Sequence, residues 1–502
     1  MELNFKSAEI PCWTEVFSQT LRREAAQEAI VPDTLPDIGT ILSSSGQVLI
    51  RGKDVGEGRV RIETNLPIKI ACEGSSGEGV FLQEMDIPLT LSVEDPAISE
   101  AAPCVAELAL TTLEVKAPNP RKLSVRAEVT ARLRCFSPDR LLLPGVPEQA
   151  AEGVHLREQE WALTKIAAVT EKTFILTDEF TLPQDRPAVS LLDSQLLLDT
   201  PDCRTVGNKL VIKGAARSRL VYLTEDGTAA PLEVSTEFNQ ILEADSLPEN
   251  PLVQLALIPS GVYYEFNGEG KAGNLELHLV AQAVICGAET VRGVVDAYSN
   301  ANPLEADTEE LPLRRVLRSV TQQETLAERI NLPQPAEAVT AVTVQPGVPI
   351  GEGDGIRLPL TVSACYQTAA GELRTLRHGT SVRFPGETEA NRRVEPTGVC
   401  VQELTLLPSG SGLELRAAVE LRGLLWEEAS VTCISALRFD PEERLDSAVW
   451  PSLVLLRPEE SMELWTLARE NHSTVEAIRE SNHLEGEEVS GGEKLLLIPK
   501  CL

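Results

Sequence analysis

The chain has 502 residues, a length typical of about three or four domains. Its 45 basic and 76 acidic side chains give a formal net charge of −31, spread along the whole chain. Such a charge repels phosphate backbones and anionic lipids, so the composition excludes nucleic acid and the membrane surface as partners.

The N-terminus predicts no export. The first residues, MELNFKSAEIPCWTEV, lack a basic region followed by an apolar stretch, so they do not resemble a signal peptide. No run approaches the roughly 18 apolar residues of a membrane span. We therefore expect a cytoplasmic protein. Its ten cysteines include no C-x-x-C pair and lie mostly in strand-like runs, so we expect reduced core residues rather than ligands or disulfides.

Three segments of the chain are copies of one another. They read TEVFSQTLRREAAQEAIVP, TKIAAVTEKTFILTDEFTLP and RRVLRSVTQQETLAERINLP, and they end at Pro32, Pro183 and Pro333. The spacings of 151 and 150 residues are too long for a solenoid repeat and indicate tandem domains. The first copy has a helix-like composition and the second a strand-like one. Since one answer must hold for all copies, we predict strands.

Further strand patterns follow inside the copies. The run 47–52 (QVLIRG) in the first copy is similar to 209–214 (KLVIKG) in the second, and the third copy lacks a clear counterpart. Late in each copy apolar residues alternate with polar ones, at Leu123, Val125, Ala127 and Val129, then Leu275, Leu277, Leu279 and Ala281, then Leu413, Leu415, Ala417, Val419 and Leu421. This period indicates antiparallel sheets with one buried face.

The predicted fold is therefore mainly β, with three tandem antiparallel β-sandwich or barrel-like domains at 1–150, 151–310 and 311–448, the last degenerate. The Pro- and acid-rich segments 144–153 and 302–312 are predicted to be solvated connections between domains.

A small strand–helix–helix–strand module is predicted for residues 451–499. Apolar runs at 453–456 and 495–498 flank two short helical patterns. The first has Ser461 as its expected N-cap, with Leu464, Leu467 and Ala468 on one face. The second begins at Ser473 with Glu476 in a capping box, and Gly491-Gly492 supplies the turn into the last strand.

No catalytic, cofactor-binding or metal-binding residue can be named from the sequence. The five histidines are scattered, and His472 and His483 have no cysteine between them. The loop Gly351–Gly355 is not followed by Lys-Ser/Thr, so it is not a phosphate-binding loop. Residues 408–412 (PSGSG) predict a hairpin turn, and no GxSxG elbow occurs. We expect a protein that is not an enzyme.

The C-terminal segment resembles a LysM module in Leu464-Trp465-x-Leu467-Ala468, Thr474-Val475-x-Ala477-Ile478, Ser481-Asn482-His483-Leu484 and Gly492-x-Lys494-Leu495. The resemblance implies binding of N-acetylglucosamine polymers through the loops before the first helix and the last strand. Here Ser461-Met462-Glu463 replaces the usual Gly-Asp-Thr, and ten carboxylates face four basic side chains. We therefore expect a protein partner, bound by Glu460, Ser461, Met462, Glu463, Trp465, His483, Glu485, Glu488 and Ser490. A structural role for Trp465, partly buried, is the alternative.

Across nearly its whole length the chain resembles the SipL-type spore coat morphogenetic proteins, which carry repeated SPOCS domains and a C-terminal LysM module. The exit from the second copy, Val294-Val295-Asp296-Ala297-Tyr298-Ser299, is typical of that family. The resemblance implies a scaffold in the mother-cell cytoplasm, at the forespore and spore coat surface. Its implied partner is the coat basement-layer ATPase, stage IV sporulation protein A. The alternative is a peptidoglycan- or cortex-binding protein that uses the LysM module for glycan, and exposed sheet edges are further candidate association sites.

Overall fold

A computed structural model describes the chain except for residues 1, 4, 6–7, 76–78, 144, 148–151, 199–201, 245–246, 388, 441, 446–448, 450, 493–494 and 502. The fold is mainly β, as predicted. The segments that end at Pro32, Pro183 and Pro333 are strands, which confirms the choice of strand over helix.

Within the described residues each repeat forms a unit of seven strands in the same order. The first unit comprises β2 (Ala8–Ile30), β3 (Ile38–Gly46), β4 (Leu49–Gly56), β5 (Arg59–Gly74), β6 (Val80–Glu94), β7 (Cys104–Asn119) and β8 (Lys122–Leu143). The second comprises β9 (Val154–Thr181), β10 (Ala188–Leu198), β11 (Asp202–Val206), β12 (Lys209–Thr224), β13 (Ala229–Glu243), β14 (Leu252–Phe266) and β15 (Ala272–Ser299). The third comprises β16 (Leu304–Asn331), β17 (Ala336–Pro346), β18 (Ile350–Glu352), β19 (Gly355–Thr368), β20 (Leu373–Pro385), β21 (Arg392–Ser409) and β22 (Gly412–Phe439).

Each unit is a sandwich of two antiparallel sheets. One sheet has β8, β15 or β22 at its centre, flanked by the first and sixth strands of the unit. The other has β5, β12 or β19 at its centre. The alternating residues predicted from the sequence, such as Leu123, Leu277 and Leu415, are fully buried between the two sheets. Burial of one face of each sheet is therefore what the alternation encodes.

The repeat extends to irregularities of the backbone. In each unit the first and last strands pair along their length (β2 with β8, β9 with β15, and β16 with β22), and we call each of these a long strand pair. An extra residue interrupts the three pairs at Val16, Ala167 and Leu317, which are 151 and 150 residues apart like the three prolines. Such β-bulges bend a strand and increase its twist. They allow residues of the three units to be matched one to one.

The structure corrects four predictions. The run 47–52 lies at and before the start of β4, whereas 209–214 begins β12, so the two are not equivalent. The counterparts of β12 are β5 and β19, and the third unit is therefore complete. Residues 302–312 are not a solvated connection, because β16 begins at Leu304 and pairs with β22 over its whole length. The predicted boundary at 310–311 cuts this strand, and the predicted connection 144–153 lies partly outside the described residues.

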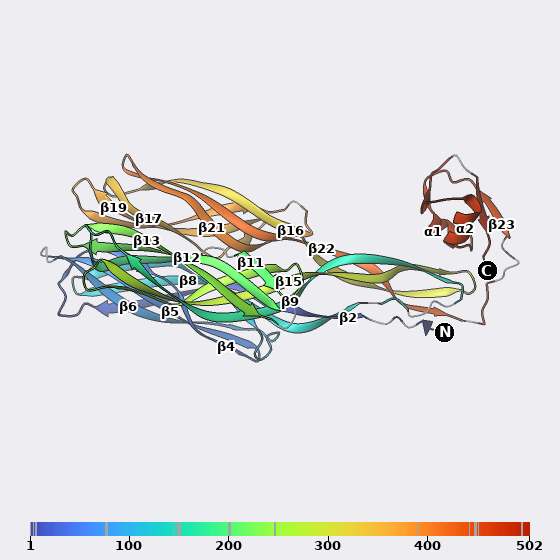
Figure 1. The fold of residues 1–502 in the computed structure, drawn as a ribbon, viewed down its shortest axis with the longest axis horizontal. Helices are drawn as coiled ribbons and strands as arrows, with labels where there is room; N and C mark the ends of the chain where they lie inside the picture. Colours follow the sequence, from blue (N-terminus) through green and yellow to red (C-terminus); the bar gives the residue numbers. More distant parts are fainter. Residues whose placement is uncertain are drawn as a thin grey trace.

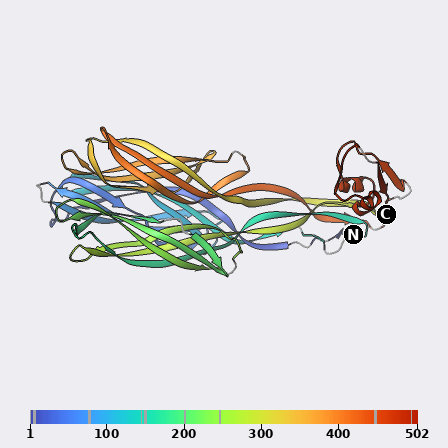
Figure 2. The same cartoon turned by 45° about the horizontal axis from the view of Figure 1, so that its top comes forward.

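The three sandwiches lie side by side at one end of the molecule. Their long strand pairs continue together as a stalk toward the other end (Figures 1 and 2). A strand of 28 residues such as β9 spans about 90 Å at roughly 3.3 Å per residue, enough for both parts. The stalk has its own core, with buried residues from all three long strand pairs: Leu143, Leu163, Val291, Leu311, Leu313 and Cys433. Strand β1 (Glu2–Leu3) pairs with β22 near the tip.

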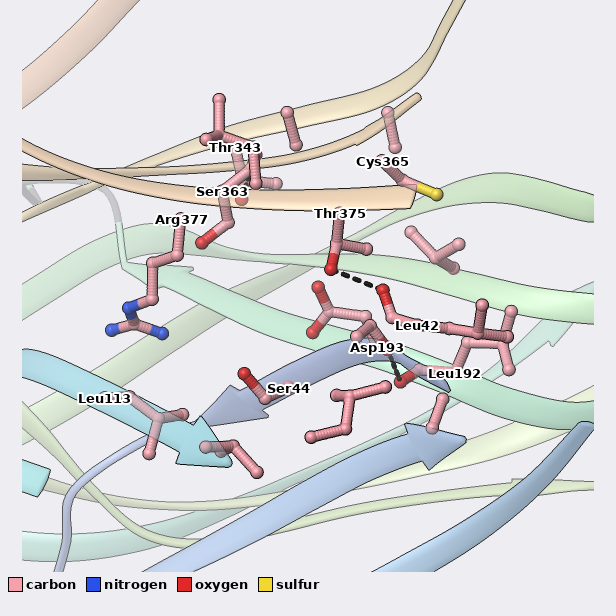
Figure 3. Close-up of a pocket in the computed structure, with 18 of the residues that line it drawn as sticks. Leu42, Ser44, Leu113, Leu192, Asp193, Thr343, Ser363, Cys365, Thr375 and Arg377 are labelled. Carbon is pink, nitrogen blue, oxygen red and sulfur yellow. Dashed lines mark hydrogen bonds between the residues drawn. The ribbon is translucent and has the colours of Figure 1, made fainter. Parts of the chain in front are cut away.

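The sandwiches also share a seam. Equivalent segments of β3, β10 and β17 meet around a cavity of about 380 Å³ (Figure 3). Hydrogen bonds cross it from Thr375 to the carbonyl of Leu42, and from Ser43 Oγ to the carbonyl of Leu192 at 3.4 Å. Burial raises the pKa of Asp193, and burial lowers the pKa of Arg377 to about 10. The cavity can offer these two groups and several hydroxyls to a small polar molecule.

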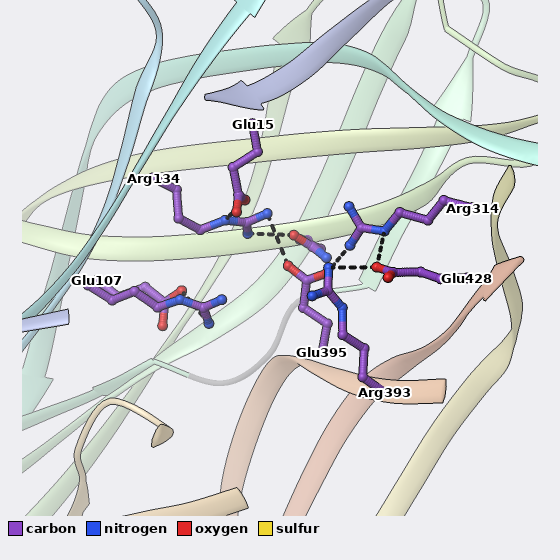
Figure 4. Close-up of polar contacts among 9 residues, drawn as sticks. Glu15, Glu107, Arg134, Arg314, Arg393, Glu395 and Glu428 are labelled. Atoms are coloured by element: carbon purple, nitrogen blue, oxygen red, sulfur yellow. Dashed lines mark hydrogen bonds and ion pairs between the residues drawn. The ribbon is translucent and has the colours of Figure 1, made fainter. Parts of the chain in front are cut away.

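Closer to the stalk the three units meet at one buried arginine. Arg134 of β8 contacts one group of each unit: it donates hydrogen bonds to Glu15 Oε2 at 2.6 Å and Gln254 Oε1 at 2.7 Å, and it forms an ion pair with Glu395 Oε1 at 3.0 Å (Figure 4). Its side chain is 7% exposed. Burial alone would lower the pKa of Arg134, but the charges of Glu395 and Glu15 outweigh it, and the net shift is upward. The guanidinium is therefore charged and fully committed to the junction.

Apolar side chains surround this arginine. Phe136, Cys286 and Trp426 occupy equivalent positions beside the three bulges and pack in one cluster. Arg314 lies 4.0 Å from the centre of the Trp426 ring and also contacts Glu395. Burial raises the pKa of the nearby Glu107 carboxyl, against the pull of Arg132 and Arg134. The position equivalent to Arg134 is Val284 in the second unit and Leu424 in the third, so only the first unit supplies this charge.

Replacing Arg134 tests its role in joining the units. Arg134→Leu copies the third unit's residue but leaves Glu15 without its partner and Glu395 with Arg314 alone, so we expect a loss of about 3–5 kcal/mol in the free energy of unfolding. The matched control is Arg140→Leu on the same strand, whose exposed pair with Glu9 contributes under about 1 kcal/mol. Denaturant unfolding measures both, and equal losses would contradict the assignment.

Candidate partner-binding site

The C-terminal module (residues 453–499) contains β23 (Leu453–Leu456), β24 (Met462–Glu463), α1 (Leu464–Glu470), α2 (Val475–Asn482), β25 (Glu488–Val489) and β26 (Leu496–Pro499). Its core consists of Leu464, Leu467, Ala468, Ile478, Leu496 and Ile498, all almost fully buried. The spacing of the apolar residues in the two helices thus reports their buried faces correctly.

Both predicted helix caps are displaced. The N-cap of α1 is Glu463 rather than Ser461, and its side chain makes no capping bond. The N-cap of α2 is Thr474, whose hydroxyl accepts a hydrogen bond from the Ala477 amide at 3.0 Å. Ser473, the predicted cap, is instead buried, and its hydroxyl donates to the carbonyl of Pro499. The last strand therefore competes for the serine and shifts the helix start by one residue.

The module docks on the tip of the stalk through Asp296. A bulge at Val295 of β15 precedes this residue. The Asp296 carboxylate accepts hydrogen bonds from Trp465 Nε1 and from Arg469 Nη1, both at 2.8 Å. Arg157 of β9 forms a bidentate pair with Glu463 at 2.6 and 3.1 Å. Bidentate geometry fixes orientation as well as distance, so α1 is held in one pose.

Tyr298 supplies the apolar part of this contact. Its ring is 6% exposed, lies edge-on to Trp465 with centres 4.8 Å apart, and stacks on His155. Its hydroxyl donates to the carbonyl of Ser473 at 3.1 Å, and Asn300 donates to the same oxygen. Burial raises the pKa of Tyr298, and burial lowers the pKa of His155. Both groups therefore stay neutral around neutral pH.

The structure separates the nine predicted binding residues into two groups. Glu463 and Trp465 contact the stalk, and Met462 packs against the core of the module. The remaining six are exposed: Glu460, Ser461, His483, Glu485, Glu488 and Ser490. Pairing of β24 with β25 brings the two predicted loops together, with Glu463 opposite Glu488. A Cβ at Gly491 would lie 2.6 Å from the carbonyl oxygen of Glu459, so glycine permits this approach.

A leucine face on the module was not predicted. In β23 and β26 the side chains of Val454, Leu456, Leu496 and Ile498 point into the core. The opposite face presents Leu453, Leu455 and Leu497, at 51%, 58% and 39% exposure, with Leu495 beside them. We call these four residues the leucine face. Strand β23, which carries two of these leucines, lies on the side of the module away from the sandwiches (Figure 1).

The sequence carried a signal for this face. Two uninterrupted apolar strands normally indicate a sheet buried on both sides. The two short helices cover only one side, so the other had to remain open. Asn482 at the end of α2 borders the face, because its side chain exchanges two hydrogen bonds with the backbone of Leu497.

Comparison with models of known protein families and with curated proteins finds no match to this chain. Among the residues that the structure describes, no group of three or more His, Cys, Asp or Glu side chains is placed to hold a metal ion. The described helices are also too short and too polar to cross a bilayer. The candidate site is therefore assigned from geometry alone: an exposed apolar face and an acidic rim on a module held at the end of a stalk.

Removing the Asp296 carboxylate should release the module. Asp296→Ala leaves Trp465 and Arg469 without their acceptor, and hydrogen bonds to charged groups are worth about 1.5–3 kcal/mol. We expect protease cleavage in the segment 440–452 to become about tenfold faster or more. Asp307→Ala, which removes an exposed stalk carboxylate paired with Arg438, is the control and should leave cleavage unchanged. Equal cleavage in both variants would refute docking through Asp296.

Docking should also depend on pH. The hydrogen bonds from Arg157 lower the pKa of Glu463 from its ordinary 4.5. Because the folded pKa is depressed, the pair stabilises the docked module above pH 4.5, and this stabilisation is lost as pH falls through the depressed pKa. The fluorine NMR signal of fluorotryptophan at position 465 should shift in this range, and the shift should be absent in Glu463→Gln. The same titration in both proteins would exclude the carboxylate as its cause.

Proposed function

We propose that this protein is a non-catalytic scaffold of the bacterial spore coat, and that its C-terminal module binds a coat basement-layer protein. The observation that carries the proposal is the leucine face. Four exposed leucines on one small module form the kind of apolar patch that marks a protein-binding surface. Its position at the far end of a stalk with its own core suits presentation to another protein.

The loops of the module support a protein partner over a glycan. Where a sugar-binding LysM module carries Gly-Asp-Thr, this chain has Ser461-Met462-Glu463, and Glu463 is bound to Arg157 of the stalk. That loop therefore serves internal docking. The remaining surface is apolar and acidic, which favours a partner segment with apolar side chains and basic neighbours. The partner that the family resemblance implies is stage IV sporulation protein A, at the forespore surface in the mother cell.

The body of the molecule supports a structural role. The three sandwiches are joined by Arg134 and by pairing of Trp13 with Ile166, which connects β2 to β9. One pair of sheet edges is thus used inside the chain. A three-unit body with a module at its end is a spacer that holds the leucine face away from the sandwiches.

Introducing negative charge into the leucine face tests the proposal. Burial of two leucines contributes about 1.5–3 kcal/mol each, so Leu455→Glu with Leu497→Glu should weaken binding of the full-length chain to purified stage IV sporulation protein A more than tenfold. The matched control is Leu407→Glu in the third unit, a leucine that is more exposed, at 63%, than either of these two. Calorimetric titration gives the dissociation constants.

Two outcomes would contradict the proposal. One is a double variant that binds as tightly as the parent chain. The other is co-sedimentation of the full-length chain with insoluble peptidoglycan, unaffected by the leucine substitutions, which would favour the glycan-binding alternative.

A further inference from the structure

Two cysteines of the first unit lie directly opposite each other on neighbouring strands. Cys104 of β7 is in register with Cys135 of β8, and both are buried, at 3% and 0% exposure. The Phe136 amide donates to the Pro103 carbonyl at 2.9 Å, so the adjacent pair is the hydrogen-bonded one. The two cysteines therefore form a non-hydrogen-bonded pair, in which Cα atoms are about 4.5 Å apart. That separation lies within the range of disulfides.

The surroundings favour ionisation of one thiol. The hydrogen bond from Cys135 lowers the pKa of Cys104, and the charge of Lys53 adds to this effect. The same hydrogen bond raises the pKa of Cys135, which holds the shared proton. Lys53 is kept in place by the carbonyl of Cys104 at 2.6 Å and by its ion pair with Glu171 of the second unit. A low-pKa cysteine beside a second thiol is the arrangement of a redox-sensitive pair.

A pocket gives small molecules access to Cys104. It encloses about 530 Å³ between the first and second units and is lined by Lys53, Cys104, Glu171 and Gln282, among others. Both cysteines belong to the same core cluster of the first unit, and of the two it is Cys104 that also lines this pocket. A reagent that enters the pocket therefore meets Cys104 first.

The other two units show that packing does not require cysteine here. The position of Cys135 corresponds to Ile285 and Leu425, and that of Cys104 corresponds to their partners Val253 and Val394. The same fold thus builds this part of the sandwich twice with aliphatic pairs. Two thiols replace them together only in the unit that also has a lysine and a pocket beside them.

We propose that Cys104 and Cys135 are a peroxide-oxidised dithiol that closes to a disulfide. The Cys104 thiolate attacks one oxygen of hydrogen peroxide, which forms the Cys104 sulfenic acid and releases hydroxide. The Cys135 sulfur then attacks the Cys104 sulfur and displaces the hydroxyl group, which leaves as water with the Cys135 proton. The sum is two thiols and one peroxide giving one disulfide and two waters, a two-electron oxidation of the protein.

The disulfide would link β7 covalently to β8, the central strand of its sheet in the first unit, where β7 contacts the second unit. Two residues beyond Cys104, the Ala106 amide donates to Gln282 Oε1 of the second unit at 2.9 Å. A cross-link in this strand restricts the unfolded chain and stabilises the folded one. Oxidation would therefore harden the junction of the first two units.

Peptide mapping tests the proposal on the full-length chain. After hydrogen peroxide treatment, denaturation and alkylation without reductant, the peptides of Cys104 and Cys135 should be recovered as one species lacking two hydrogens, and two fewer thiols should be alkylated. The melting temperature should rise by a few degrees and return to its starting value on reduction.

The chain supplies its own controls. Cys104→Val and Cys135→Ile, singly and together, copy the second unit and should keep the parent's melting temperature while abolishing the peroxide-induced rise. Cys72→Ala, at a buried cysteine in another core cluster of the same unit, should retain the peroxide-induced rise in melting temperature. The proposal fails if both thiols remain alkylatable after peroxide, if Cys104 is found only as a sulfinic or sulfonic acid, or if the double variant shows the same rise.

Discussion

A single buried guanidinium constrains the whole molecule. Arg134 is removed from water and receives its compensation from Glu15, Gln254 and Glu395, one group from each unit. A buried charge without partners is costly, so none of the three units can leave the junction without exposing that cost. With the sandwiches fixed in this way, their long strand pairs must run together, and the apolar residues of the stalk can bury one another. This arrangement also fixes where the C-terminal module docks, because its partners Asp296 and Tyr298 lie at the end of the long strand pair of the second unit.

The repeats provide an internal comparison that shows where the chain has specialised. Equivalent positions hold Arg134, Val284 and Leu424 at the junction. At the seam they hold Ser43, Asp193 and Ala341, each directly after the second bulge of its strand. Inside the sandwiches the pattern of buried aliphatic residues is retained. Differences in chemistry thus gather where units meet, since there the three copies face unlike neighbours.

Local patterns in the sequence account for the units and fail for their assembly. Alternation at Leu275, Leu277 and Leu279 reports burial on one face of a strand, and the proline spacing reports the repeat. The segment 302–312 was misread because its charges suit solvent. It is a strand nonetheless, held by β22 and by the pair of Asp307 with Arg438. Trp465 was identified as a binding residue, yet its acceptor Asp296 lies 169 positions away, and no local pattern connects them. Contacts of this kind depend on how the three long strand pairs are arranged in space.

The proposed function depends on the same architecture. A leucine face is useful for recognition only if the module that carries it is held away from the body, and the stalk does this only if the three units behave as one. Differential scanning calorimetry of the full-length chain measures that cooperativity most directly. The account predicts one transition for the three sandwiches and the stalk, with equal calorimetric and van't Hoff enthalpies. Three separate transitions, each with the enthalpy of one unit, would contradict it.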